Sequence, residues 1–224
     1  MREFERGNTH LRYDFMTSLD GEDYFWMRID AHTYYWTDDE SVHMFVYRKN
    51  IDAEKSQEIQ MASQVERDDM THIYHKMATQ RHIEQLLSEH PEKLYGFFIF
   101  DIDNFKQVND KCGHAFGDLV IIEFVHTIQQ HFHEDDIIGR IGGDEFVAFI
   151  PLANEGQAEE KAKELSESLD KTFSSGAKSW HMSASIGVAT APKDGVDFDA
   201  LYQKADLALY QTKERGKSGY TLFQ

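Results

Sequence analysis

The sequence predicts an α+β protein that consists of two modules joined by a helix. Residues 9–50 have extended character and many aromatic side chains, whereas residues 52–90 are rich in helix formers and contain no Gly or Pro. From Pro91 onward, strand-like and helix-like segments alternate to the end of the chain. This order fits a β-α-β-β-α-β, ferredoxin-like core, in which we expect helices on one face of a mostly antiparallel sheet.

The first module, residues 1–51, is expected to form a small antiparallel β-meander. Three segments have the aromatic and β-branched bias of strands, namely residues 9–18, 23–36 and 42–50. The pair Asp20–Gly21 and the polar stretch 37–41 supply the turns between them. Three strands bury little apolar surface, so we expect this sheet to pack on another element or to pair with a second copy of the chain.

A helical linker, residues 52–67, is expected to lead into the second module, residues 68–224. The helical pattern is interrupted near residues 67–75, where we expect a break or a loop. In the second module, the periodicity predicts a hairpin at 136–150, strands at 93–103, 180–190 and 218–223, and helices at 117–132, 154–173 and 197–216.

Composition and charge exclude several classes of protein. The 224 residues carry a formal net charge of −17, which argues against a nucleic-acid or anionic-membrane surface because polyanions are repelled. No run of about 18 apolar residues occurs, so no membrane contact is expected within the chain. The single cysteine, Cys112, excludes an intramolecular disulfide and fits the reducing cytoplasm, where we expect the protein to act. The twelve histidines are scattered without a zinc motif, so we assign no zinc.

Acidic residues follow an apolar strand and recur at a glycine-rich turn. Asp101 and Asp103 end the apolar run 96–100, and Asp144 and Glu145 follow a Gly-Gly pair in the stretch RIGGDEFVAFI. A tight turn of this kind favours glycine because it needs positive φ. Two interpretations are open at this point: the acids are a solvated strand end and hairpin tip, or they form a carboxylate cluster that binds a cation.

The second interpretation applies if the strand and the hairpin lie side by side, because this brings Asp101 near Asp144 and Glu145. Clustered carboxylates suit Mg²⁺, which often shares its coordination shell with phosphate oxygens and water. Phosphoryl or nucleotidyl transfer at such a site depends on positioning and charge neutralisation. The cations that a triphosphate would require are available in Lys106, Lys213 and Lys217. Each of these lysines, taken alone, is more often a solvated surface charge.

Five motifs occur in order along the second module: DIDNFKQVND at 101–110, GHAFGD at 113–118, RIGGDEF at 140–146, SIGVA at 185–189 and ADLALYQTKERGK at 205–217. Through these motifs, residues 68–224 resemble the GGDEF family of diguanylate cyclases. The resemblance implies a nucleotidyl-cyclase core that condenses two GTP molecules into cyclic di-GMP with release of pyrophosphate, in a homodimer with one GTP in each subunit. It also implies Mg²⁺ as the cofactor, with Mn²⁺ as an alternative.

The resemblance further implies roles for individual residues. The metal ligands would be Asp101, the carbonyl of Ile102, and Asp144. The catalytic residues would be Asp144, Glu145 and Lys106. The substrate-binding residues would be Asn104, Phe105, Asn109, His114, Asp118, Gly142, Gly143, Lys213 and Lys217. Asn109 and Asp118 would read guanine, since an acid at position 118 accepts the N–H donors that guanine has and adenine lacks.

Three stretches depart from the family pattern. The leading stretch DDMTHIYHK replaces the family's Gly, Asn and Arg with His72, His75 and Lys76. Near the C-terminus, the family's Arg and Asn are replaced by Lys217 and Ser218, and Lys lacks the bidentate fork of Arg. The product-inhibition motif RxxD retains only Asp136, with His133 at the position of the arginine. We therefore expect the product not to bind tightly at that inhibitory site.

The first module resembles the last three strands of a PAS domain and the junction that follows them, on the segments DGEDYFWMRIDAHTYYW and VHMFVYRKNIDAEKSQE. Only part of such a domain is present, so either the chain belongs to a larger sensor or its exposed sheet edge pairs with another chain. Two other functions remain as alternatives to the cyclase. One is a non-catalytic GGDEF-like module that binds GTP or cyclic di-GMP for signalling, and the other is a dimerisation scaffold based on the N-terminal sheet.

Overall fold

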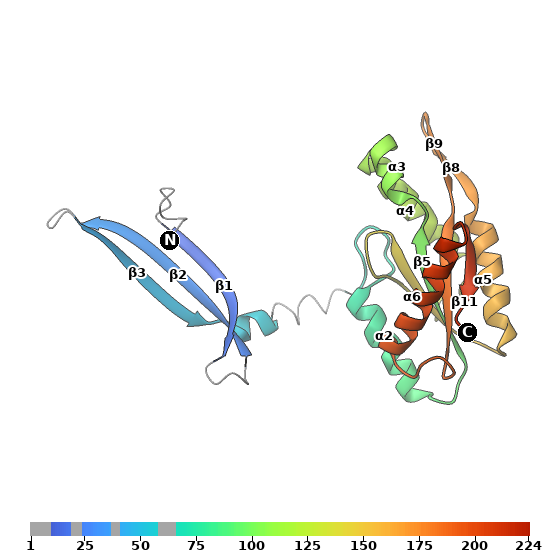
Figure 1. Cartoon of the computed structure of the whole chain (residues 1–224), viewed down its shortest axis with the longest axis horizontal. Helices are drawn as coiled ribbons and strands as arrows, with labels where there is room; N and C mark the ends of the chain where they lie inside the picture. Colours follow the sequence, from blue (N-terminus) through green and yellow to red (C-terminus); the bar gives the residue numbers. More distant parts are fainter. Residues whose placement is uncertain (1–9, 19–23, 37–40, 58–65) are drawn as a thin grey trace. The chain divides into compact units, whose positions relative to one another are not determined.

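The computed structural model describes residues 10–18, 24–36, 41–57 and 66–224. The chain divides into two compact units, residues 1–64 and 65–224 (Figure 1). The predicted turn at Asp20–Gly21, most of the turn at 37–41, and linker residues 58–65 lie outside the described residues. The part of the linker that the structure describes is helical from Asp52 to Gln57.

The first unit contains a three-stranded antiparallel sheet in the order β1-β2-β3, which confirms the predicted meander. Its strands are β1 (His10–Ser18), β2 (Tyr24–Trp36) and β3 (Ser41–Asn50). The backbone amide of Ile51 donates to the Trp26 carbonyl at 2.9 Å, and the Trp26 amide donates to the Asp52 carboxylate at 2.9 Å. These two bonds hold the exit from β3 against the start of β2.

The second unit is built on a six-stranded mixed sheet in the order β11-β10-β5-β7-β6-β4. The inner strand β5 is antiparallel to both of its neighbours, while the pairs β10–β11 and β4–β6 are parallel. The strands are β4 (Tyr74–His75), β5 (Tyr95–Ile102), β6 (Ile137–Arg140), β7 (Glu145–Pro151), β10 (Ala184–Ala191) and β11 (Gly219–Leu222). The predicted α+β class is confirmed.

Helices cover both faces of this sheet, so the expectation of helices on one face is wrong. One face packs against α2 (Lys76–Glu89) and α6 (Phe198–Glu214), and the other against α4 (His114–Gln129) and α5 (Gly156–Leu169). The reason lies in β5, where Phe97 and Ile99 pack with α2 and α6, whereas Phe98 and Phe100 pack with α4 and α5. A strand that is apolar at consecutive positions needs cover on both faces. None of the described helices is long and apolar enough to cross a membrane.

Two further elements differ from the sequence expectations. The segment Phe105–Cys112 forms a helix, α3, although it is mostly polar and its one buried residue is Val108. The predicted helix 154–173 ends at Leu169, after which β8 (Lys171–Ser175) and β9 (Lys178–Met182) form a hairpin. Gly176 in its turn has φ 60°, a left-handed conformation that favours glycine. The predicted strand 180–190 is therefore divided between β9 and β10.

Candidate active site

Three carboxylates meet where β5 ends and β7 begins. Asp101 of β5 and Glu145 of β7 are register partners, and side chains of such partners lie beside each other on the same face of an antiparallel pair. Asp144 directly precedes Glu145, and its carbonyl accepts a hydrogen bond from the Ile102 amide at 3.3 Å. The structure therefore brings together Asp101, Ile102, Asp144 and Glu145, as the sequence predicted.

The electrostatics of this carboxylate cluster favour a cation. Burial raises the pKa of Asp101, and the hydrogen bond from the Lys213 ammonium, 2.7 Å from Oδ2, only partly offsets that effect. Burial also raises the pKa of Glu145, and the neighbouring charges of Asp101 and Asp144 raise it further. Like charges that share a half-buried site disfavour ionisation, and a divalent cation among them reverses this effect. The oxygen-only donor set is of the kind that Mg²⁺ prefers.

Asp103 lies two residues beyond Asp101 but has a different role. It is 3% exposed, and its carboxylate accepts hydrogen bonds from the Ser183 and Ser185 hydroxyls at 2.7 Å and from the Ser218 amide at 2.9 Å. Three donors satisfy a carboxylate that would otherwise be costly to bury. Asp103 therefore ties the end of β5 to β10 and to the loop before β11.

The predicted phosphate-binding residues lie at the start of α3 and in the loop before β11. Asn104 precedes α3 in a left-handed conformation with φ 58°, and its side-chain oxygen accepts a hydrogen bond from the Lys217 ammonium at 2.8 Å. Phe105, the first residue of α3, packs partly into the core, while Lys106 is exposed. Lys217 itself has φ 67°, so its side chain reaches Asn104 from a left-handed turn. The structure therefore brings Lys217 to Asn104 and Phe105, the two residues that follow the anchored Asp103.

The predicted guanine-reading residues lie where α3 meets α4. A Cβ atom added at Gly117 would lie 2.0 Å from the side-chain oxygen of Asn109, so the carboxamide of Asn109 rests on the backbone of α4 beside Asp118. Asp118 is exposed in the second turn of α4, and His114 is the exposed first residue of that helix. The structure thus brings Asn109 to the helical turn that carries Asp118, with His114 one turn away.

Arg140 ties the hairpin loop to the leading loop, a role that we did not predict. Its guanidinium donates to the Gly143 carbonyl at 2.7 Å, to the Gly142 carbonyl at 3.2 Å and to the Asp68 carboxylate at 3.3 Å. Asp68 also accepts hydrogen bonds from the Thr71 amide at 2.9 Å and hydroxyl at 2.7 Å. Burial alone would raise the pKa of Asp68, but the bonds from Thr71 and Arg140 outweigh it and lower that pKa.

The glycines of the hairpin differ from the expectation in their backbone conformation. Among the described residues, the glycines in the left-handed region do not include Gly142 or Gly143, so the positive φ expected for this turn is wrong. A Cβ atom at Gly142 would lie 3.0 Å from a carboxylate oxygen of Glu145. Gly142 therefore leaves space for the carboxylate cluster, while the carbonyls of both glycines accept hydrogen bonds from Arg140.

The unusual residues of the leading loop fit the backbone to different degrees. His72 has φ 57°, a conformation that glycine adopts without steric cost and that a residue with a Cβ atom adopts only at some cost in free energy. His75 replaces Asn successfully, because its Nδ1 atom accepts hydrogen bonds from the Met77 and Ala78 amides at 3.1 and 3.3 Å and caps α2. The loop thus keeps a left-handed residue at position 72 and a side-chain cap at position 75.

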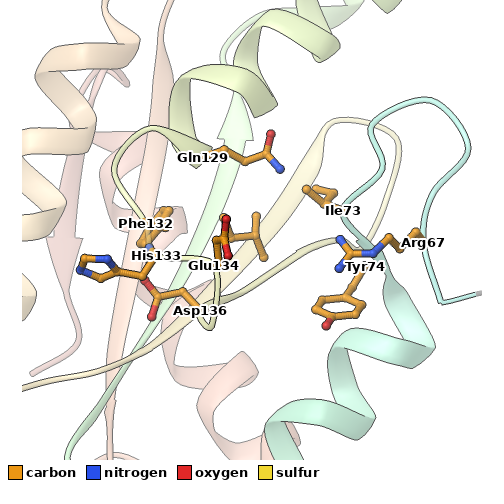
Figure 2. Close-up of a pocket in the computed structure, with 9 residues that line it drawn as sticks. Arg67, Ile73, Tyr74, Gln129, Phe132, His133, Glu134 and Asp136 are labelled. Atoms are coloured by element: carbon orange, nitrogen blue, oxygen red, sulfur yellow. Dashed lines mark hydrogen bonds between the residues drawn. The ribbon is translucent and has the colours of Figure 1, made fainter.

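A separate pocket of about 180 Å³ contains none of the predicted catalytic, metal-binding or substrate-binding residues (Figure 2). It includes His133 and Asp136 of the altered product-inhibition motif, and the Asp136 carboxylate accepts a hydrogen bond from the His133 amide at 2.8 Å. Arg67 reaches the pocket from the leading segment and lies over the Tyr74 ring at 4.7 Å (Figure 2). The positively charged guanidinium at this pocket, that of Arg67, therefore comes from outside the altered motif.

The first unit contains a polar cluster that sequence spacing hides. Cross-strand register pairs His10 with His32 and places Asp30 beside them, with candidate ligand atoms within 4.8 Å of one another. Asp30 already accepts hydrogen bonds from His10 at 2.6 Å and from Arg12 at 3.0 Å, and the two imidazole rings are stacked 4.3 Å apart. These contacts account for the cluster as a surface ion-pair network, and we assign it no metal.

Comparison with known proteins gives a consistent result. Residues 65–219 match the family described as diguanylate cyclase, GGDEF domain. The chain is 33% identical over 159 residues to MucR of Pseudomonas aeruginosa, a bifunctional diguanylate cyclase and cyclic di-GMP phosphodiesterase. It is 31% identical over 156 residues to PdeR of Escherichia coli, a cyclic di-GMP phosphodiesterase. Each alignment covers 70% of this chain but only 23% of MucR and 24% of PdeR, so the chain spans about a quarter of their length.

A solved structure has the same fold as the second unit. The GGDEF domain of TpbB from Pseudomonas aeruginosa superposes with a TM-score of 0.66 at 28% sequence identity. The superposition covers 69% of this chain and 98% of the TpbB domain. The likeness therefore extends over nearly all of the solved domain.

Proposed function

Since the chain belongs to the GGDEF domain family of diguanylate cyclases, we propose that residues 65–224 condense two GTP molecules into cyclic di-GMP and release pyrophosphate. The observation that carries the proposal is the carboxylate cluster, in which Asp101 and Glu145 are register partners and Asp144 adjoins them. Nucleotidyl transfer needs clustered oxygen ligands of this kind to neutralise a triphosphate.

The donor set fits a divalent cation, with Asp101, the Ile102 carbonyl and Asp144 as its ligands. Bound Mg²⁺, or Mn²⁺ in its place, would neutralise the phosphates and stabilise the leaving pyrophosphate. The raised pKa values of Asp101 and Glu145 support this assignment, since each carboxylate is short of positive charge in its own surroundings.

The chain's own residues would bring about one bond exchange, which occurs twice for each product. The 3′-oxygen of one GTP attacks the α-phosphorus of the other, the bond between the α-phosphorus and the bridging oxygen breaks, and pyrophosphate leaves with the electron pair. Asp144, assisted by Glu145, accepts the proton of the 3′-hydroxyl. Lys106 and Lys213 stabilise the charge that develops on the phosphates. Lys213, which bonds to Asp101 at 2.7 Å, would be released for this role when a cation binds Asp101.

Guanine would be bound between α3 and α4. The carboxylate of Asp118 can accept the N1–H and N2–H donors of guanine, and the side chain of Asn109, from α3, rests on the turn of α4 that carries Asp118. Backbone N–H groups near Asn104 and Phe105 would cradle the phosphates, and Lys217 would hold Asn104 in place. Adenine lacks the donors that Asp118 needs, so the site should select GTP over ATP.

Two copies of the chain would be required for turnover. Each carboxylate cluster would hold one GTP, and the two 3′-hydroxyls must each reach the α-phosphate of the nucleotide on the other subunit. We propose that the helical linker controls the approach of the two subunits and that the protein acts in the cytoplasm. We also propose that residues 1–51 are the C-terminal part of a PAS-like input domain. Direct partners would be GTP and a second copy of the chain.

Incubation of the purified chain with GTP and Mg²⁺ tests this proposal. Chromatography should detect cyclic di-GMP and pyrophosphate in a ratio of one to two, and ATP in place of GTP should give no cyclic product. Formation of no cyclic dinucleotide at any protein concentration would refute the proposal.

A second candidate function is a non-catalytic module that binds GTP or cyclic di-GMP. The similarity to PdeR favours this second function, because PdeR, 31% identical over 156 residues, is named as a phosphodiesterase and not as a cyclase. GTP binding without turnover would support this second function.

A further inference from the structure

Helix α3 is weakly anchored by the core. It has eight residues, of which only Val108 is buried, and a helix of this length is not stable by itself in water. Phe105 and Cys112 pack against the core only in part, so the position of α3 depends also on contacts at its two ends. Asn109, in the middle of α3, rests on Gly117 of α4, so any movement of α3 also moves Asn109 relative to Asp118.

The β8–β9 hairpin makes the contacts at the C-terminal end of α3. The Lys178 ammonium donates a hydrogen bond to the carbonyl of Cys112, which is the last residue of α3. The ammonium of Lys111, in the last turn, lies 5.4 Å from the ring centroid of Trp180. A cation at a helix C-terminus also interacts favourably with the helix dipole. Figure 1 shows α3 and the hairpin at the same end of the second unit.

The hairpin is itself fixed to the core on the same side. Phe173 and Trp180 are register partners, so they lie on one face of the hairpin, and both pack against the main hydrophobic core. The Phe173 ring lies 5.7 Å from Phe116 of α4. One face of the hairpin therefore contacts both helices that carry the guanine-reading residues.

We propose that the β8–β9 hairpin positions the guanine site, with Lys178 and Trp180 as positioning residues that hold the end of α3 and so keep Asn109 beside Asp118. This inference rests on the proposed function, since it concerns the base-binding part of the same site. The hairpin thereby contributes to the preference for guanine over adenine without contacting the base.

Calorimetric titration with the α,β-methylene analogues of GTP and ATP, in the presence of Mg²⁺, tests the inference without turnover. Lys178→Ala should weaken binding of the GTP analogue about tenfold, which corresponds to the loss of roughly one hydrogen bond in the base site. It should leave binding of the ATP analogue unchanged, because the phosphate-binding residues lie at the other end of α3, where Lys217 bonds to Asn104. Lys178→Arg retains a donor and should restore most of the affinity, while Trp180→Phe should retain more affinity than Trp180→Ala.

Lys161→Ala is the matched control. Like Lys178, Lys161 donates a hydrogen bond to a backbone carbonyl, here that of His131 at 3.0 Å and away from the base site. It also bonds to the Glu164 carboxylate at 3.0 Å and lies 5.8 Å from the Phe132 ring centroid. Lys161→Ala should leave both affinities unchanged. Equal weakening of both analogues by Lys178→Ala, or no weakening of either, would overturn the inference while leaving the proposed function intact. If the unaltered chain binds no GTP analogue, both the inference and the proposed function are refuted.

Discussion

Gly117→Ala should weaken guanine recognition while the fold is retained. The added Cβ would lie 2.0 Å from the side-chain oxygen and 3.1 Å from the Cγ atom of Asn109, and both atoms are at the flexible end of that side chain. Asn109 must therefore rotate away from Asp118. The loss of one neutral hydrogen bond to the base costs about 0.5–1.5 kcal/mol, which should raise KM for GTP by roughly two- to thirteenfold with little change in kcat.

The stability of the same variant separates this effect from general damage. Alanine is favoured over glycine within a helix by roughly 0.5–1 kcal/mol, which offsets part of the cost of moving Asn109. The thermal midpoint should therefore stay close to that of the unaltered chain.

Initial rates of cyclic di-GMP formation across a range of GTP concentrations measure the change. Asn109→Ala should raise KM to a similar extent, and Gly117→Ala should add nothing in the Asn109→Ala background, because both changes remove the same contact. The reasoning would be refuted by an unchanged KM in Gly117→Ala, or by a further increase in the double variant.

Three other predictions concern the leading loop, the carboxylate cluster and the product pocket. His72→Gly should raise the free energy of unfolding by up to about 1 kcal/mol, since it relieves a φ of 57°, and a loss of stability in urea unfolding would contradict this. Burial and nearby carboxylates raise the pKa of Glu145, so the folded state still binds this proton at pH values where the unfolded state has lost it. The metal-free chain should therefore lose stability as the pH rises toward and through that raised pKa. Glu145→Gln should reduce this slope in urea unfolding with EDTA, and an unchanged slope would count against the assignment. His133→Arg should strengthen cyclic di-GMP binding in calorimetry, whereas submicromolar binding of two or more molecules through Asp136 in the unaltered chain would contradict the expected weak site.

The carboxylate cluster could be predicted because each of its parts has a local sequence signal. An apolar run ending in Asp101 indicates the end of a buried strand, and Gly142–Gly143 marks a turn before the next strand. Once the two strands pair, their register determines that Asp101 faces Glu145. The prediction that these carboxylates lie together therefore needed only the topology and not the detailed packing.

The contacts that support the site could not be predicted in the same way. Arg140 and Asp68 are 72 residues apart, and nothing in either local sequence indicates that they pair. The signal that could have found them was position, because Arg140 directly precedes the Gly-Gly turn region and Asp68 begins the leading stretch. Helix α3 was missed because its residues are mostly polar, and its position depends on distant side chains such as Lys178 and Lys217.

The rate of cyclic di-GMP formation by Asp144→Asn, compared with the unaltered chain, tests the central claim most directly. Asparagine keeps the size and shape of the side chain but removes the charge that would bind the cation and accept the proton. We predict a rate at least about a hundredfold lower at saturating GTP and Mg²⁺, with an unchanged circular dichroism spectrum and thermal midpoint. A variant that forms cyclic di-GMP at the normal rate would contradict the assignment of catalysis to this carboxylate cluster.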